Sequence, residues 1–181
     1  MKRLNNNTIT EGLEALGSKL PQDRKFEILI LGGAAGVLSG ELPGIHTTGD
    51  VDVVHFRAAV DRDVVLDAAA KVGLELALPL YWLNDDSGLF AWTLPDEWEM
   101  RRKKIREFGP LVVYTLSRLD LIAVKFLAHR AADLEHLREL HVTPEDAKFV
   151  RSFLDAKESE CPEYRDKIAM ARSYVDNWFS S

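Results

Sequence analysis

Residues 26–56 have the sequence FEILILGGAAGVLSGELPGIHTTGDVDVVHF, which contains two apolar segments separated by glycine-rich and polar ones. Residues 26–31 are almost continuously apolar, which is typical of a strand buried on both faces. Gly32 and Gly33 follow at once, and the small residues after them predict a short helix. Turn residues then predict a loop, and residues 51–56 predict a second strand. This order predicts a sheet with helices packed on it.

Two acids, Asp50 and Asp52, stand at the start of the second strand with a spacing of two residues. Side chains at this spacing point to the same side of a sheet. Two like charges on one side repel, and burying them is costly without a cation. Carboxylate oxygens are natural ligands of Mg²⁺, so the pair predicts a metal site. The alternative is a solvated strand face without a metal.

Gly32 and Gly33 end the first strand just before the short helix. Free backbone N–H groups and the helix dipole at such a position suit a phosphate. The absence of Cβ atoms lets a nucleotide approach the backbone closely. The alternative is an ordinary tight turn. A phosphate holder together with metal-binding carboxylates is the minimum apparatus for phosphoryl or nucleotidyl transfer.

Further elements are expected on both sides of this segment. Apolar periodicity and turn residues predict helices over 8–20 and 61–72, the latter ending at Gly73, and strands over 74–80, 89–94 and 111–116. Residues 97–108 fit a helix or a strand equally well. The front two-thirds of the chain is therefore expected to be an α/β (α+β) structure.

The last third of the chain has helical patterns. Ser117 with Asp120 forms a start signal similar to a capping box, and Thr143-Pro144 is a strong helix start. The expected helices cover residues 118–129, 131–140 and 163–178, and a further one begins at residue 144. The predicted domain organisation is an α/β domain over 1–141 and a helical C-terminal extension over 142–181, packed on it.

The composition excludes several classes of protein. The chain has 181 residues, a formal charge of −6, 46% hydrophobic residues and 29% charged residues, which is typical of a globular protein. Its single cysteine, Cys161, excludes a disulfide framework and a cysteine-rich zinc site and favours a reducing compartment. No apolar run is long enough to span a membrane, and no secretory signal is evident. We therefore expect a cytoplasmic protein without a membrane partner.

Lys125 lies inside the apolar sequence LDLIAVKFLA and is expected to be partly buried. A buried lysine needs a partner or loses its charge. The functional interpretation is contact with a triphosphate or an active-site carboxylate, and the alternative is a lysine that extends from the helix edge to water. Asp133 is expected to pair with Lys125 or Arg130.

One basic cluster, Arg101–Lys104 with Arg106, stands out in the acidic chain. It could hold a triphosphate tail or an RNA backbone, or form a solvated surface. Consecutive residues cannot all face one cleft in a helix or a strand, which favours the surface. Nearby Trp82, Trp92 and Trp98 could stack on a base, although a core role in the sheet is the expectation favoured here.

The sequence LGGAAGVLSG…HTTGDVDVV resembles the signature of the DNA polymerase β-like nucleotidyltransferase superfamily: an apolar strand, a glycine pair, then D-x-D. Within it, the chain most resembles the bacterial AbiEii-type toxin branch and its uncharacterised relatives. The sequence TLSRLDLIAVKFLAHRAADLEHLREL resembles the helical motif of that branch, with Lys125, Ala128, Arg130 and Asp133 at the matching positions. The resemblance covers about residues 26–150.

The resemblance implies a nucleotidyltransferase-like mixed sheet with packed helices and a helical C-terminal part. It implies transfer of a nucleotidyl group from a nucleoside triphosphate to an RNA such as tRNA, or to a protein hydroxyl, with one or two Mg²⁺ ions and with a cognate antitoxin as partner. The implied catalytic and metal-binding residues are Asp50 and Asp52, and the implied nucleotide-binding residues are Gly32, Gly33, Thr48 and Lys125. The alternative is a binding or regulatory module that kept the fold and lost the chemistry.

Several positions depart from the family pattern. His46 stands where relatives often have an arginine, and His136 stands where they often have a second aspartate. The third catalytic acid of the superfamily has three candidates here, Glu97, Glu99 and Glu107. A third carboxylate within metal reach of the D-x-D pair would favour an active enzyme, and a hydrophobic or cationic residue there would favour the inactive module.

Overall fold

The computed structural model describes residues 3–40 and 47–179 and divides into two compact units. The first unit comprises Met1–Ala91 and Arg102–Leu116, and the second comprises Trp92–Arg101 and Ser117–Ser181. The boundary expected between residues 141 and 142 lies inside the second unit. The proposed division into domains at that point stays a prediction.

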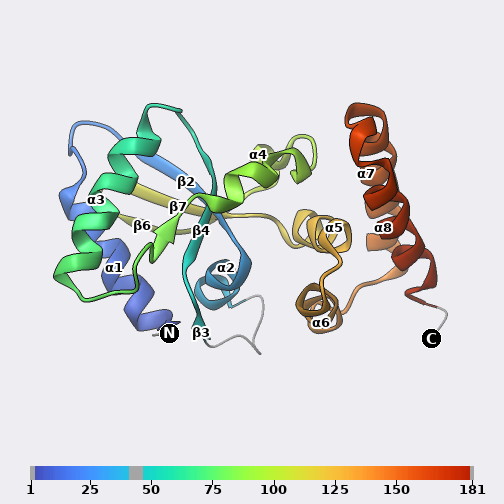
Figure 1. The fold of residues 1–181 in the computed structure, drawn as a ribbon, viewed down its shortest axis with the longest axis horizontal. Helices are drawn as coiled ribbons and strands as arrows, with labels where there is room; N and C mark the ends of the chain where they lie inside the picture. Colours follow the sequence, from blue (N-terminus) through green and yellow to red (C-terminus); the bar gives the residue numbers. More distant parts are fainter. Residues whose placement is uncertain (1–2, 41–46, 180–181) are drawn as a thin grey trace. The chain divides into compact units, whose positions relative to one another are not determined.

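A five-stranded mixed sheet with the order β5-β4-β2-β7-β6 forms the centre of the first unit (Figure 1). Its strands are β2 (Phe26–Leu31), β4 (Val51–Phe56), β5 (Leu83–Asn84), β6 (Lys103–Phe108) and β7 (Leu111–Thr115). β2 is antiparallel to β4 and parallel to β7, β5 is parallel to β4, and β6 is antiparallel to β7. The prediction that the glycine-pair strand and the D-x-D strand are neighbours in a mixed sheet is confirmed.

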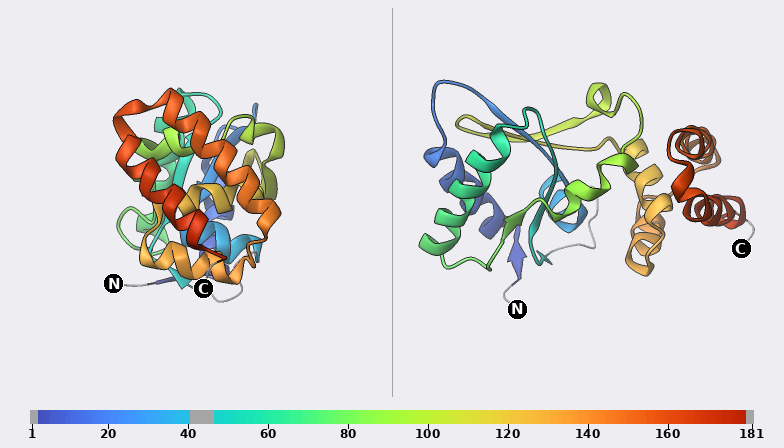
Figure 2. Two further views of the ribbon diagram at one scale, coloured as in Figure 1. Left: turned by 90° about the vertical axis from the view of Figure 1, so that its right-hand side faces the viewer. Right: turned by 45° about the horizontal axis from the view of Figure 1, so that its top comes forward.

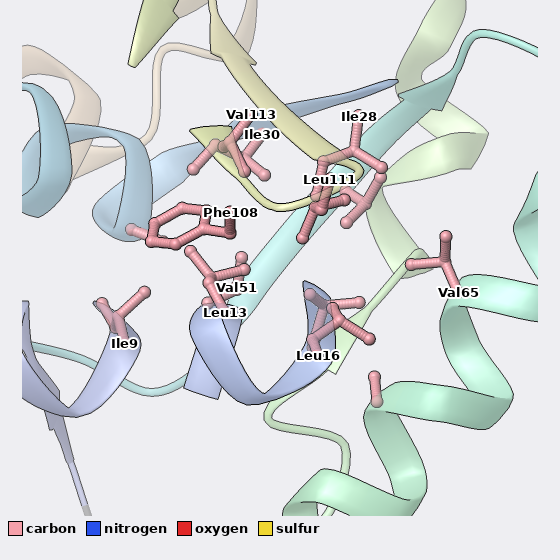
Figure 3. Close-up of a cluster of buried hydrophobic side chains, with 14 of the residues drawn as sticks. Ile9, Leu13, Leu16, Ile28, Ile30, Val51, Val65, Phe108, Leu111 and Val113 are labelled. Carbon is pink, nitrogen blue, oxygen red and sulfur yellow. The ribbon is translucent and has the colours of Figure 1, made fainter. Parts of the chain in front are cut away.

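Three helices and a small ribbon complete the first unit. The helices are α1 (Asn6–Lys19), α2 (Gly32–Ser39) and α3 (Asp61–Glu75), and the ribbon pairs β1 (Leu4–Asn5) with β3 (Thr47–Thr48). α1 and α3 pack on one face of the sheet. Figure 3 shows the core between them, with α1 and α3 contributing Ile9, Leu13, Leu16 and Val65 and the sheet contributing Ile28, Ile30, Val51, Phe108, Leu111 and Val113.

The segment after α3 differs from the sequence-based expectation. α3 continues through Gly73 to Glu75. A Cβ at Gly73 would lie only 3.0 Å from the Trp82 Cδ1 atom, so glycine suits this position because of packing rather than as the end of the helix. The expected strands over 74–80 and 89–94 are wrong, since the former is the helix end and a turn, and the latter lies largely in the 3₁₀ helix η1 (Asp86–Thr93). Residues 97–108 contain both a helix, α4 (Trp98–Arg101), and the strand β6.

The second unit is helical, as the sequence predicts. It contains α4 and α5 (Arg118–Ala128), α6 (Ala131–Glu139), α7 (Pro144–Glu160), the 3₁₀ helix η2 (Pro162–Tyr164) and α8 (Arg165–Asn177). Ser117 caps α5 by accepting a hydrogen bond from the Asp120 N–H at 3.2 Å, and Thr143 forms a full capping box with Asp146 on α7. Figure 2 shows α7 and α8 packed side by side.

None of the helices in the described part of the chain combines the length and the apolar character needed to cross a membrane.

Candidate functional site

β4 places the two acids of the D-x-D pair on one side of the sheet. Val51 and Val53 are fully buried in the core beneath α1 and α3. Because side chains alternate along a strand, Asp52 projects from the opposite face, and Asp50, which directly precedes the strand, has the same parity. Both acids are half-buried. The alternation expected from the sequence is therefore present.

The glycine pair lies beside these acids because β2 and β4 are neighbours. Leu31, the last residue of β2, is in register with Asp52. Gly32 follows with a left-handed φ of +68°, a conformation that costs other residues about 1–2 kcal/mol. A Cβ at Gly32 would lie 3.1 Å from the Asp52 Oδ2 atom. The structure thus brings Gly32 and Asp52 into direct proximity.

The N-terminus of α2 begins at this point without a capping side chain. Leu31 is the N-cap residue, and its apolar side chain makes no capping hydrogen bond. The first backbone N–H groups of an α-helix have no partner within the helix, and they carry the positive end of its dipole. Gly32 and Gly33 are the first two residues of α2, so this end of the helix is suited to an anion.

Thr48 packs against the second glycine of the pair. It lies on β3, is 9% exposed, and is paired with Leu4 of β1. A Cβ at Gly33 would lie 2.6 Å from the Thr48 Oγ1 atom and 3.0 Å from its Cβ. The structure therefore brings together five of the six residues assigned from the sequence: Gly32, Gly33, Thr48, Asp50 and Asp52.

Replacing Gly33 with Ala should lower the free energy of unfolding by about 1–3 kcal/mol, because the new methyl group overlaps the Thr48 side chain. Adding Thr48→Ala should recover part of this loss, since it removes the nearer of the two contacts. The matched control is Gly88→Ala, because nothing lies within 4 Å of a Cβ at Gly88. Urea unfolding of the four proteins measures the effects, and equal losses for Gly33→Ala and Gly88→Ala would contradict this packing.

Asn84 is part of the site and was not predicted from the sequence. It lies on β5, where its Cα is in register with that of Asp52. Its Nδ2 donates a hydrogen bond to the Asp50 Oδ2 at 3.3 Å. A two-residue strand is too short to show a period, and the sequence around Asn84 resembles a turn. No sequence signal therefore pointed to this residue.

None of the candidate third acids joins the pair within the first unit. Glu107 lies on β6, which is three strands from β4, or about 14 Å at the usual strand spacing. There it pairs with Lys25 and Lys104, which lower its pKa to about 2. Glu97 and Glu99 belong to the second unit. Across residues 3–40 and 47–179, no group of three or more His, Cys, Asp or Glu side chains is arranged to hold a metal ion.

Lys125 lies on α5 in the second unit and is 5% exposed. Its Nζ donates to the Asp133 Oδ1 at 3.3 Å and to the His136 Nδ1 at 2.8 Å. Asp133 also accepts a hydrogen bond from Arg130 Nε at 2.6 Å. Asp133 was expected to pair with Lys125 or Arg130, and it pairs with both. The expectation that Lys125 is at least partly buried is confirmed. The nucleotide-binding role of Lys125 stays a prediction.

Burial and neighbouring charges together set the protonation of the Lys125–Asp133–His136 cluster. Burial lowers the pKa of Lys125, although Asp133 opposes the shift. Burial and the adjacent Lys125 charge lower the pKa of His136. Burial alone would raise the pKa of Asp133, but the bonds to Arg130 and Lys125 outweigh it, and the pKa is lowered. A neutral His136 accepting from a charged Lys125 fits these directions.

The basic cluster is divided between the two units. Arg101 is in the second unit, where it forms three hydrogen bonds with the fully buried Asp120. Arg102 is in the first unit, where it donates to Glu27 Oε2 at 2.7 Å and lies 3.9 Å above the Tyr114 ring. Lys104 pairs with Glu107 at 2.5 Å. These arginines and this lysine therefore have structural partners.

The tryptophans also have structural roles. Trp82 is in the core, and its Nε1 donates to the Ala69 carbonyl at 2.9 Å. Trp92 stacks on Tyr164 with ring centroids 4.0 Å apart, and Trp98 is buried, so both belong to the second unit rather than to the sheet core. His46, the departure nearest to the D-x-D pair, lies outside the described residues.

A family of proteins described as nucleotidyltransferases of unknown function (DUF6036) has a sequence model that matches residues 7–178. The chain belongs to this family. The match spans nearly the whole chain, including both units and every residue of the site. No match was found among curated proteins or among solved structures. The match supports the nucleotidyltransferase assignment, and the resemblance to the AbiEii-type branch stays a prediction.

Proposed function

We propose that this protein is a Mg²⁺-dependent nucleotidyltransferase that moves a nucleotidyl group from a nucleoside triphosphate to a hydroxyl of an RNA, such as tRNA, or of a protein. The single observation that supports it most is the proximity of Gly32 and Asp52 at the adjoining ends of two paired strands. An uncapped helix N-terminus and a carboxylate pair then share one side of the site.

The residues present fit a Mg²⁺ ion. Mg²⁺ usually binds through one or two carboxylates and substrate phosphates and keeps several waters, so Asp50 and Asp52 supply a sufficient set of protein ligands. The missing Cβ at Gly32 leaves space beside the Asp52 Oδ2 atom. When bound, the ion would neutralise charge on the phosphates during transfer.

The chain's own groups would bind and orient the substrate. The backbone N–H groups of Gly32 and Gly33 would donate to the terminal phosphates. Thr48, which packs against Gly33, would hold the glycine pair in place. An acceptor hydroxyl would then attack the α-phosphorus, and pyrophosphate would leave as the bond to it breaks. The protein supplies position and charge rather than covalent chemistry.

A second candidate function is a nucleotidyltransferase-fold module without activity, acting as a binding or regulatory partner. Two observations favour it: Asn84 rather than a third carboxylate lies beside Asp50, and Lys125 is already satisfied by Asp133 and His136. The resemblance to the AbiEii-type branch extends either proposal to a bacterial cytoplasmic toxin–antitoxin pair, with a cognate antitoxin as partner.

Incubation of the protein with each α-³²P-labelled nucleoside triphosphate, Mg²⁺ and total RNA tests the proposed activity. We expect label to move to RNA or to protein with one preferred nucleotide and to stay in the triphosphate when EDTA replaces Mg²⁺. No transfer with any nucleotide, together with retained binding of nucleotide or protein partner, would support the inactive module instead.

A further inference from the structure

Asn84 is buried next to both acids of the site. It is 8% exposed, its amide reaches Asp50, and its strand partner is Asp52. Neighbouring side chains in register on paired strands lie about 5 Å apart, so all three side chains belong to one cluster. Asn84 therefore occupies the position from which a further carboxylate could join the pair.

The orientation of the Asn84 amide is fixed by the backbone around it. Its Oδ1 accepts a hydrogen bond from the Asp86 N–H at 3.0 Å, and its Nδ2 donates to the Tyr81 carbonyl at 3.3 Å. A backbone N–H can only donate and a carbonyl can only accept, so the amide has one acceptable orientation. Its NH₂ group points to Asp50, and its oxygen already accepts the hydrogen bond from the Asp86 N–H.

We propose that Asn84 is a positioning residue that holds the Asp50 carboxylate and limits the site to one divalent cation. The inference rests on the proposed function, because it assumes that Asp50 and Asp52 bind the metal. Two carboxylates balance the charge of one divalent ion. In the absence of nucleotide, a second ion a few ångströms away would need a further negative ligand from the protein, and Asn84 presents a donor instead.

The variant Asn84→Asp tests this charge limit with little change of shape. The new carboxylate keeps an acceptor for the Asp86 N–H, so the start of η1 retains its hydrogen bond. It loses the Nδ2 donor to Asp50 and to the Tyr81 carbonyl, and it places a second negative charge beside Asp50. Without metal the two carboxylates repel, and with metal they form a site for another cation.

Mn²⁺ is the probe, and electron paramagnetic resonance of free Mn²⁺ gives both stoichiometry and affinity. We call an ion Asp50-dependent when it is lost on Asp50→Asn substitution. We expect one such ion per chain in the wild type and two in Asn84→Asp, where the first ion should bind about tenfold more tightly than in the wild type. Asn84→Ala should keep one ion and bind it more weakly, since Asp50 is no longer held. In EDTA the Asn84→Asp protein should melt below the wild type and recover when Mn²⁺ is added.

The matched control is Asn177→Asp, which adds the same charge on the exposed end of α8 and should leave one ion bound. Two Asp50-dependent ions in the wild type, or one ion of unchanged affinity in Asn84→Asp, would overturn this inference and leave the proposed function standing. Absence of Asp50-dependent Mn²⁺ binding from every variant would overturn both.

Discussion

Replacing Asp52 with Asn should reduce nucleotidyl transfer at least about a thousandfold, because several kcal/mol of charge stabilisation in the transition state depend on a metal-binding carboxylate. Asp50→Asn should have a comparable effect. Asn keeps the size of Asp and removes its charge, so the loss reports on metal binding rather than on packing. The measurement is the initial rate of label transfer from the preferred nucleotide at saturating Mg²⁺.

Folding should survive both substitutions. The Asn84 amide can still donate to the oxygen of an Asn at position 50, and removing one of two like charges relieves repulsion. We expect thermal melts within a few degrees of the wild type or slightly above it. The matched control is Asp67→Asn on the exposed side of α3, which should retain full activity. If Asp50 had only a structural role, Asp50→Asn would instead lower the free energy of unfolding by about 1–3 kcal/mol and leave nucleotide binding unchanged.

The central part of the fold was predictable because its segments are long and strongly patterned. The apolar runs predict strands over residues 26–31 and 51–56, and both bounds agree with the structure. Residues 74–80 have the apolar composition of a strand but form the end of α3 and a turn, where Leu76 and Leu78 pack against the core and Leu74 and Leu80 are exposed. Gly73 has the sequence signature of a helix end but lies within α3, where a Cβ would crowd the Trp82 ring. Tertiary packing overrides local signals at such positions.

The candidate site was predictable only as far as single strands determine it. The period of two placed Asp50 and Asp52 on one side, and the strand-to-helix junction placed Gly32 there. The neighbour on the far side, Asn84, depends on the pairing of β5 with β4, a contact between residues 32 positions apart that no local pattern encodes. The partition of the basic cluster between two units is likewise a long-range outcome.

The second large effect concerns the buried cluster of the helical unit. Asp133→Ala should lower the free energy of unfolding by about 3–5 kcal/mol, because it leaves the buried Lys125 ammonium without its carboxylate. Urea unfolding at pH 7 measures the loss. The folded-state pKa of Asp133 is lowered, so its stabilisation is complete above the unfolded pKa of about 3.9 and is lost as the pH falls through the lowered value. The difference between the two proteins should therefore shrink in acid.

The cause of this loss is an uncompensated buried charge, and a second substitution separates that cause from a loss of packing. Lys125→Met removes the charge at nearly constant length, so the double variant Lys125→Met/Asp133→Ala should be more stable than Asp133→Ala alone. Asp176→Ala is the matched control, because it breaks the exposed Arg151–Asp176 pair at 3.0 Å in the same unit and should cost less than about 1 kcal/mol. If the double variant were instead less stable than Asp133→Ala, removing Lys125 would cost stability even without Asp133. The Lys125 ammonium would then not depend on Asp133, and its hydrogen bond to His136 would be sufficient.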